Sequence, residues 1–383
     1  MSADIARRAA TALALAGLLA ATACAPTEVE DGADDAFFIG GKADAEEPGV
    51  CETTGVLRLV NATDAEGLRL DAGLTRRAAG NVATWRAGDD GAQGTEDDRL
   101  FVTLDELDAV PYIGPVALER LLGRAGELGW TDCPQIPGGR RTLGPAACPP
   151  PGTAARVAFF DADSTLRVSR SGSVTANGVD DVLLLPFASG AIARLNEQGY
   201  LVAIVSNQLG VSRRIITAEV AEGALLYTAD RLRLLQARVD YIDFAERANA
   251  DRKPGTGMAL RLEEALRQTC GCEVDLDGSF MVGDSGYEEG EDGPHPDGRP
   301  ADDFSNSDRL FAENLGIEFS EPTDFFGWRE YGVYNVADAA QLEAFLDAID
   351  AEAAQLRESG DDAARLLELA DEAAANRLVN GSF

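Results

Sequence analysis

Histidine is almost absent from this sequence: His295 is the only one in 383 residues. A single imidazole excludes catalytic and metal sites that need two, among them the HExxH zinc peptidases and the two-histidine zinc fingers. A Ser-His-Asp triad would depend on His295 itself, and the glycine and proline residues around it are typical of a loop. The phosphate-binding loop motif GxxxxGKS/T is also missing, because Ala36 occupies the glycine position upstream of Gly41 and Lys42. This argues against a P-loop kinase.

Positive charge is scarce as well. The chain has 33 Lys and Arg residues against 66 Asp and Glu residues, a formal net charge of -33. Proteins that coat nucleic acid carry a basic surface, so this balance argues against that class. It does not exclude chemistry on a nucleic acid at one locally positive cleft. The hydrophobic fraction of 45% is enough for packed cores, and the length suits two or three domains.

The N-terminus has the features of an export signal. Arg7 and Arg8 precede an apolar stretch, residues 9–23, that is too short to span a bilayer as a helix. Cys24 follows Ala-Thr-Ala and resembles the lipid-modified cysteine of bacterial lipoproteins, while ordinary signal cleavage remains the alternative. We therefore expect residues 1–24 to be a signal segment. The protein would be exported, either anchored to a membrane by lipid or free in the periplasm or outside the cell.

The rest of the chain divides into parts by composition. The expected parts are an acidic tether, a small helical module, a Pro- and Gly-rich linker, an α/β domain and C-terminal helices, at residues 25–50, 51–133, 134–153, 154–336 and 337–383.

Five cysteines follow Cys24, so one is left over if the others pair in an oxidising compartment. Cys51 and Cys133 bracket the small module and are placed to close it. The sequence leaves the full connectivity open.

Three apolar runs in the α/β domain each lead into polar side chains. They are residues 157–160, 201–205 and 280–282. Continuous apolar runs are typical of buried parallel strands, and ligands of such sheets bind beyond the carboxyl ends of the strands. We expect a site there, built from residues that follow these runs: Asp161, Asp163, Ser206 and Asp284.

These residues, with Lys253, resemble the motifs of the haloacid dehalogenase superfamily of phosphotransferases. The pattern is Asp161-x-Asp163-x-Thr165 after the first strand, Ser206 after the second, then Lys253, then Gly283-Asp284. The resemblance implies a Rossmann-like, three-layer parallel α/β sheet. Only 42 residues, 164–205, separate the first motif from Ser206, which leaves no room for a large cap. An uncapped site admits a polymer end, whereas small-substrate enzymes commonly close a lid.

The resemblance also implies the roles of the residues. Asp161 would attack phosphorus to give an aspartyl-phosphate, Asp163 would act as general acid and then base, and Ser206 and Lys253 would hold phosphate oxygens. Mg2+ is the expected cofactor, with ligands from Asp161, Asp163 (its backbone carbonyl), Asp284 and Asp308. Asp303 is the rival of Asp308, and helix capping is the structural alternative for either. The expected substrate contacts are Ser164 (at a position usually held by glycine), Thr165, Asn207 and Arg213.

Within the superfamily, the chain is similar to the polynucleotide kinase 3′-phosphatase family over residues 155–327. The similar segments are residues 169–173, 206–213, 252–258, 303–319 and 321–326. The resemblance implies removal of a 3′-phosphate from a DNA end. In this reading, four arginines could supply positive charge for the phosphates of the DNA strand: Arg167, Arg170, Arg213 and Arg214. The alternative is that these arginines serve surface solubility. Two other functions stay open: a phosphatase of small monoesters of the sugar or histidinol phosphate type, and a non-catalytic surface protein that binds DNA.

The small module contains a second resemblance. Residues 104–122 are similar to a helix-hairpin-helix, in which backbone N–H groups at a helix N-terminus meet a DNA phosphate, and residues 72–85 resemble a degenerate first copy. A helical pair used for protein contact is an equal alternative. The acidic, glycine-rich residues 88–98 lack EF-hand spacing, and we expect a plain turn there.

Overall fold

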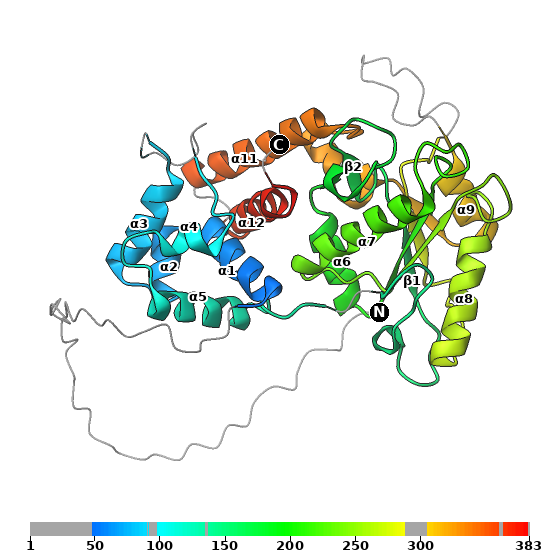
Figure 1. Cartoon of the computed structure of the whole chain (residues 1–383), viewed down its shortest axis with the longest axis horizontal. Helices are drawn as coiled ribbons and strands as arrows, with labels where there is room; N and C mark the ends of the chain where they lie inside the picture. The colour runs from blue at the N-terminus through cyan, green and yellow to red at the C-terminus, as the bar shows by residue number, and fades with distance from the viewer. Residues whose placement is uncertain are drawn as a thin grey trace, which may run out of the picture. The chain divides into compact units, whose positions relative to one another are not determined.

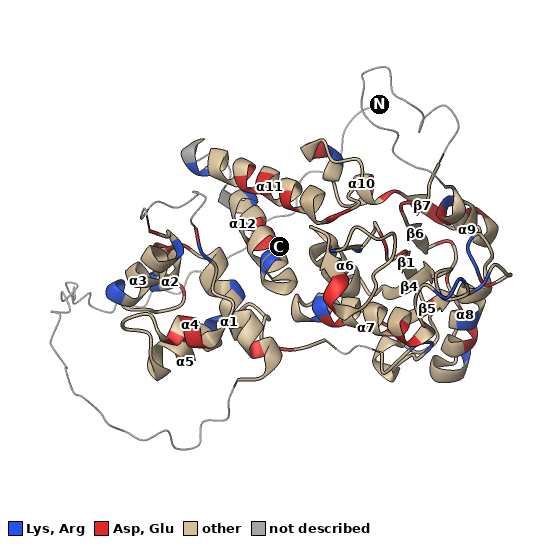
Figure 2. Cartoon of the chain, turned by 45° about the horizontal axis from the view of Figure 1, so that its top comes forward, with Lys and Arg blue, Asp and Glu red and all other residues tan. Residues whose placement is uncertain are grey.

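The apolar runs form strands of a five-stranded sheet in the computed structural model (Figure 1). All neighbouring strands are parallel, and their order is β5–β4–β1–β6–β7, as Figure 2 shows. Phe160, the last residue of β1, pairs with Ile204 and with Val282, where β6 also ends, while β4 continues to Asn207. This confirms the expected parallel α/β fold. The strands are β1 (Val157–Phe160), β4 (Leu201–Asn207), β5 (Tyr241–Ala245), β6 (Phe280–Val282) and β7 (Glu318–Ser320).

The structure describes residues 48–89, 91, 98–134, 137–287, 305–359 and 363–381. The expected signal segment, almost all of the tether, His295 and Asp303 lie outside these residues. Residues 48–383 form one unit, and the description below concerns that unit. Among the described residues, no helix combines the length and the apolar character needed to cross a membrane.

Helices cover both faces of the sheet and create two separate cores. Side chains alternate along a strand, so Phe159 and Phe160 of β1 point to opposite faces. Phe160 packs in the core that includes α6 and α7, and Phe159 packs in the core that includes α8 and α9. The result is the expected three-layer arrangement. The helices of this domain are α6 (Ala188–Glu197), α7 (Ala218–Leu234), α8 (Gly257–Cys270), α9 (Ser307–Leu315), the short α10 (Pro322–Phe325) and the 3-10 turn η3 (Trp328–Tyr331).

The segment between β1 and β4 contains no large cap. It holds an antiparallel hairpin of β2 (Arg167–Ser169) and β3 (Val182–Leu184), the 3-10 turn η2 (Val179–Asp181) and α6. Every residue of this segment is described. This segment therefore contributes one short hairpin, and no separate cap domain, beside the carboxyl edge of the sheet.

Within the part of the chain that the structure describes, five helices precede the sheet, and they have a core of their own. They are α1 (Val50–Ala62), α2 (Ala65–Leu70), α3 (Arg76–Arg86), α4 (Leu104–Asp108) and α5 (Pro115–Glu127). The turns α2–α3 and α4–α5 match each other: Gly73 and Tyr112 have φ of 69° and 70°, and each is followed by a buried aliphatic residue and then by a helix N-cap. The module is thus built from two similar helix–turn–helix units. Their use in DNA binding stays a prediction.

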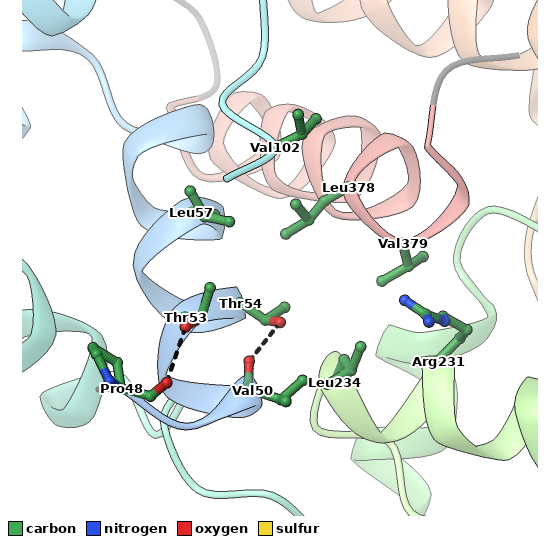
Figure 3. Close-up of a pocket in the computed structure, with 10 residues that line it drawn as sticks. All are labelled: Pro48, Val50, Thr53, Thr54, Leu57, Val102, Arg231, Leu234, Leu378 and Val379. Atoms are coloured by element: carbon green, nitrogen blue, oxygen red, sulfur yellow. Dashed lines mark hydrogen bonds between the residues drawn. The ribbon is translucent and has the colours of Figure 1, made fainter. Parts of the chain in front are cut away.

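The C-terminal helices α11 (Ala339–Ser359) and α12 (Ala363–Asn380) connect this module with the sheet domain. Arg58 of α1 donates to Asp371 of α12 with its Nε at 2.7 Å. The side-chain amides of Asn376 and Asn380 donate to the Leu184 carbonyl of β3 at 3.1 and 3.0 Å. An apolar pocket of about 260 Å3 remains where α1, α7 and α12 meet (Figure 3).

Two disulfides are present in the described part of the chain. Cys51 pairs with Cys133, as the bracketing suggested, and Cys148 pairs with Cys270, so Cys272 is the free thiol among the cysteines that the structure describes. The expected linker is also packed on the sheet domain, since the Arg141 N–H donates to the Ile242 carbonyl of β5 at 2.8 Å. It contains one 3-10 turn, η1 (Pro145–Ala147).

Candidate active site

The site lies at the carboxyl edge of the sheet, where three strands end. Asp161 follows β1, and its N–H donates to the Val282 carbonyl of β6 at 2.9 Å. Ser206 lies near the end of β4, and Asp284 comes two residues after β6. Because the strands of a parallel sheet have their carboxyl ends at the same edge, the chain brings these three residues together there.

Three carboxylates meet at this edge. Asp161, Asp284 and Asp308 each place an oxygen within 4.8 Å of the others. Asp308 is the second residue of α9, and its Oδ2 accepts the Ser285 N–H at 3.2 Å. Asp161 and Asp308 are buried, and Asp284 is half-buried. An all-oxygen cluster of this kind fits a hard divalent cation such as Mg2+.

Lys253 places a positive charge beside the cluster. Its buried Nζ lies 2.5 Å from Asp161 Oδ1 and 2.8 Å from Asp308 Oδ1. The carboxylate oxygens of the cluster and their burial fit a magnesium ion.

Burial acts on the pKa values of both Asp161 and Lys253. It raises the pKa of Asp161 to about 7, Lys253 opposes that rise, and the nearby Asp308 and Asp163 carboxylates add to it. For Lys253, burial acts to lower the pKa, but the attraction of Asp161 and Asp308 outweighs it and the pKa is raised. The ammonium therefore stays charged at neutral pH.

Asp163 is held from two sides. Its Oδ1 accepts Arg167 Nε at 2.9 Å, and its Oδ2 accepts Gln208 Nε2 at 2.8 Å. Gln208 Nε2 also donates to Ser206 Oγ at 2.9 Å, so one amide links Asp163, which follows β1, with Ser206 of β4. Gln208 is not among the expected site residues, although it directly follows Ser206 and Asn207.

The expectation that Arg167 supplies charge to a bound strand is wrong. The side chain is 1% exposed and donates to Asp163 and, through Nη1 at 3.0 Å, to Thr228 Oγ1. The cause is a tight turn after the first motif: the Arg167 N–H bonds to the Ala162 carbonyl at 3.0 Å and the Ser164 N–H to the Arg167 carbonyl at 2.8 Å. This turn directs the arginine inward.

Asn207 holds the lysine in place. Its Nδ2 donates to the Lys253 carbonyl at 3.1 Å, and its Oδ1 accepts the Lys253 N–H at 2.9 Å. The side chain thereby fixes the backbone of the β5–α8 connection to the end of β4. Asn207, which we expect to contact the substrate, thus also bonds to Lys253, the partner of Asp161.

The remaining expected residues lie around the site. Ser164 has φ of 59°, the left-handed conformation that explains why glycine suits this position. Thr165 is fully buried, and its Oγ1 has no hydrogen-bond partner among the described residues. Arg213 and Arg214 are exposed on the loop after β4, whereas Arg170 Nη2 donates to the Asn380 carbonyl at 2.9 Å. Figure 2 shows basic residues scattered among acidic ones over the described helices.

Comparisons with known proteins agree with this geometry. The family model described as polynucleotide kinase 3 phosphatase matches residues 156–326. An uncharacterized 20.8 kDa protein of Autographa californica nuclear polyhedrosis virus is 32% identical over 177 residues, which cover 44% of this chain and 85% of the viral protein. The bifunctional polynucleotide phosphatase/kinase of Schizosaccharomyces pombe is 29% identical over 171 residues, 44% of this chain and 36% of the yeast protein.

Sugar phosphatases are also similar. A D-glycero-beta-D-manno-heptose-1,7-bisphosphate 7-phosphatase of Rhodopseudomonas palustris is 32% identical over 112 residues, which cover 26% of this chain and 59% of the relative. Among solved structures, the D,D-heptose 1,7-bisphosphate phosphatase of B. bronchiseptica, complexed with magnesium and phosphate, is 23% identical with a TM-score of 0.33. That match covers 43% of this chain and 78% of the other.

Proposed function

Because the chain belongs to the polynucleotide kinase 3 phosphatase family of haloacid dehalogenase-like phosphatases, we propose that it removes 3′-phosphates from DNA ends with the help of Mg2+. That it is a phosphoric monoester hydrolase follows from the family. The observation that carries the proposal is the cluster of Asp161, Asp284 and Asp308 beside Lys253. A clustered acidic site next to a buried ammonium is suited to holding a phosphate group and a divalent metal together.

Four residues would hold the metal. They are Asp161, Asp284 and Asp308 through their carboxylates and Asp163 through its backbone carbonyl, as the resemblance implies. When bound, Mg2+ would offset the repulsion between the carboxylates and the phosphate. Lys253 and the Ser206 hydroxyl would bind phosphate oxygens and stabilise the charge that develops on them.

The chain's own carboxylates would perform the two chemical steps. In the first, an Asp161 oxygen attacks phosphorus while the bond from phosphorus to the 3′ oxygen breaks and Asp163 gives that oxygen a proton. In the second, Asp163 takes a proton from water, which attacks the aspartyl-phosphate. Inorganic phosphate leaves and Asp161 returns as a carboxylate. Proton transfer by Asp163 requires its carboxylate to be held within hydrogen-bond reach of the reacting oxygens.

Three observations support a DNA end as the substrate. Between β1 and β4 the chain forms only a short hairpin, the 3-10 turn η2, connecting loops and α6, so this segment adds no cap that would exclude a long molecule. The exposed Arg213 and Arg214 follow β4 and would contact backbone phosphates. The name of the yeast relative points to the same substrate class.

A small phosphate monoester of the sugar type is the alternative substrate. The heptose-bisphosphate phosphatases among the relatives and the net charge of -33 favour it. The two are separated by measuring kcat/KM with Mg2+ for a 3′-phosphorylated oligonucleotide and for a panel of sugar phosphates. A higher kcat/KM for the oligonucleotide supports our proposal, and a higher value for a sugar phosphate would replace it with the alternative.

We also propose that the protein is exported. Two disulfides within the described residues suit an oxidising compartment, and the N-terminal segment has the composition of a secretory signal. The helix–turn–helix units that precede the sheet would then serve as a tether for the DNA strand. Mass spectrometry of the secreted or membrane fraction would show cleavage before Cys24 and, if the lipid signal is used, lipid on that cysteine.

A further inference from the structure

A buried arginine, Arg167, contacts the carboxylate that the proposed mechanism uses for proton transfer. We propose that Arg167 is a positioning residue that fixes the orientation of Asp163, so that Asp163 protonates the leaving oxygen. The inference rests on the proposed phosphatase chemistry and adds a residue to it.

The burial of Arg167 makes its partners obligatory. Its guanidinium is 1% exposed, and removing such a group from water is costly unless it is paired and hydrogen-bonded. Asp163 supplies the ion pair at 2.9 Å, and the Thr228 hydroxyl of α7 supplies a second bond at 3.0 Å. Thr228 is itself fully buried and donates to the Ala224 carbonyl at 2.8 Å. Arg167 is therefore anchored to a helix of the domain and does not face substrate.

The second oxygen of Asp163 is fixed independently. Gln208 Nε2 donates to it at 2.8 Å, and the backbone N–H of Gln208 donates to the Ala245 carbonyl of β5 at 2.9 Å. One donor comes from the β2 side and the other from β4, so the two bonds together define the plane of the carboxylate. A general acid must keep such a geometry, because a displacement of about 1 Å lowers rates by about 100-fold.

A purely structural role for Arg167 makes a different prediction. If the arginine only stabilised the turn that follows the first motif, its loss would disturb Asp161 and Asp163 together and slow every substrate alike. If it positions Asp163, its loss lowers kcat/KM only for substrates whose leaving group needs a proton. An alkoxide leaves poorly without one, whereas p-nitrophenolate is a stable anion that leaves unaided.

The test compares Arg167→Met with wild type on two substrates. One is p-nitrophenyl phosphate, and the other is the alcohol monoester that wild type hydrolyses best, whether a 3′-phosphorylated oligonucleotide or a sugar phosphate. The quantity is kcat/KM, which reports the steps up to departure of the leaving group. We expect it to fall about 100-fold for the alcohol ester and to remain nearly unchanged for p-nitrophenyl phosphate.

A second readout follows from the same variant. Since Asp163 also activates water, hydrolysis of the aspartyl-phosphate slows, and p-nitrophenol release from Arg167→Met should begin with a burst equal to the enzyme concentration. Asp163→Asn should reproduce the pattern. Arg194→Met, which removes an exposed arginine of α6, is the matched control and should leave both substrates unaffected.

Arg167→Lys keeps the positive charge but loses the guanidinium that bonds both Asp163 and Thr228. This variant serves as the test if Arg167→Met does not fold. Its kcat/KM for the alcohol ester should lie between those of wild type and Arg167→Met. An equal fall on both substrates, or no fall on either, would overturn the positioning role. A wild type that prefers sugar phosphates would refute the DNA-end proposal while leaving this comparison intact.

Discussion

Gly283 and Asp308 approach so closely that a Cβ on residue 283 would lie 2.2 Å from Asp308 Oδ2. Real Cβ atoms do not come that near to an oxygen, so any side chain at 283 displaces Asp308. Gly283 directly follows β6, and Asp308 lies in the first turn of α9. Their contact brings the Asp308 carboxylate to the site. The glycine of the Gly283-Asp284 pair is thus required by packing against a distant residue.

Gly283→Ala should weaken metal binding more than folding. Moving Asp308 away from Asp161 and Asp284 is expected to raise the Mg2+ concentration for half-maximal activity by about 10- to 100-fold, the usual effect of displacing a metal-orienting group. Mg2+ titrations of phosphate release measure this. Gly223→Ala, in an open stretch of α7, is the matched control and should show the wild-type requirement. A wild-type requirement in Gly283→Ala would mean that Asp308 is not a ligand.

Asp308→Asn should discriminate the two candidates for the last metal-binding acid. The amide keeps the shape of the side chain but removes the charge paired with Lys253 at 2.8 Å. We expect activity at low Mg2+ to be lost and partly restored at high Mg2+. Asp303→Asn, the rival position, should behave like wild type. The opposite pattern in these two titrations would assign the role to Asp303.

Asp161→Asn should abolish turnover with little loss of stability. An amide cannot form the aspartyl-phosphate. The substitution also removes one carboxylate from a crowded buried group, and Lys253 keeps Asp308 as its partner. Phosphate release should fall to the background, while the thermal midpoint stays at or above that of wild type. Retained turnover would exclude Asp161 as the nucleophile.

Glu372 should make folding stability depend on pH. Burial raises its pKa from 4.5 to about 7, the Phe187 N–H bond opposes the rise, and Asp371 adds to it. The folded state therefore holds the proton more tightly than the unfolded state. The stabilisation is complete below about pH 4.5 and is lost as the pH rises through 7, at most by roughly 3 kcal/mol.

Glu372→Gln isolates this contribution, because its amide oxygen can still accept the Phe187 N–H. Urea denaturation at pH 5 and pH 8 should show a smaller loss of unfolding free energy in the variant than in wild type. Glu343→Gln, at an exposed position of α11, should follow wild type. If the unfolding free energy changed equally between pH 5 and pH 8 in all three proteins, Glu372 would not be protonated in the folded state.

The strands and the acidic residues at their ends could be predicted from sequence because both are local. Each apolar run leads directly into its polar residue, and parallel pairing then forces Asp161, Ser206 and Asp284 to one edge. Asp308 was placed through its motif at the start of a helix. These predictions needed no knowledge of long-range packing.

The contacts of Arg167 and the Cys148–Cys270 disulfide could not be predicted in this way. Arg167 lies on a short hairpin where an arginine usually faces water, and its partner Thr228 is 61 residues away. Cys148 and Cys270 are separated by 122 residues. Nothing in the sequence next to Gln208 distinguishes it from an amide that faces solvent. In each case the partner is set by how α7, α8 and the loops pack on the sheet, and a linear pattern does not encode that.

The most direct test of the central claim uses one oligonucleotide that carries a phosphate at both ends. Incubated with the protein and Mg2+ and followed by mass spectrometry and end-labelling, it should lose the 3′-phosphate alone, and the Asp161→Asn variant should remove neither. Retention of both phosphates by wild type, under conditions in which it hydrolyses sugar phosphates, would contradict the assignment to nucleic-acid ends.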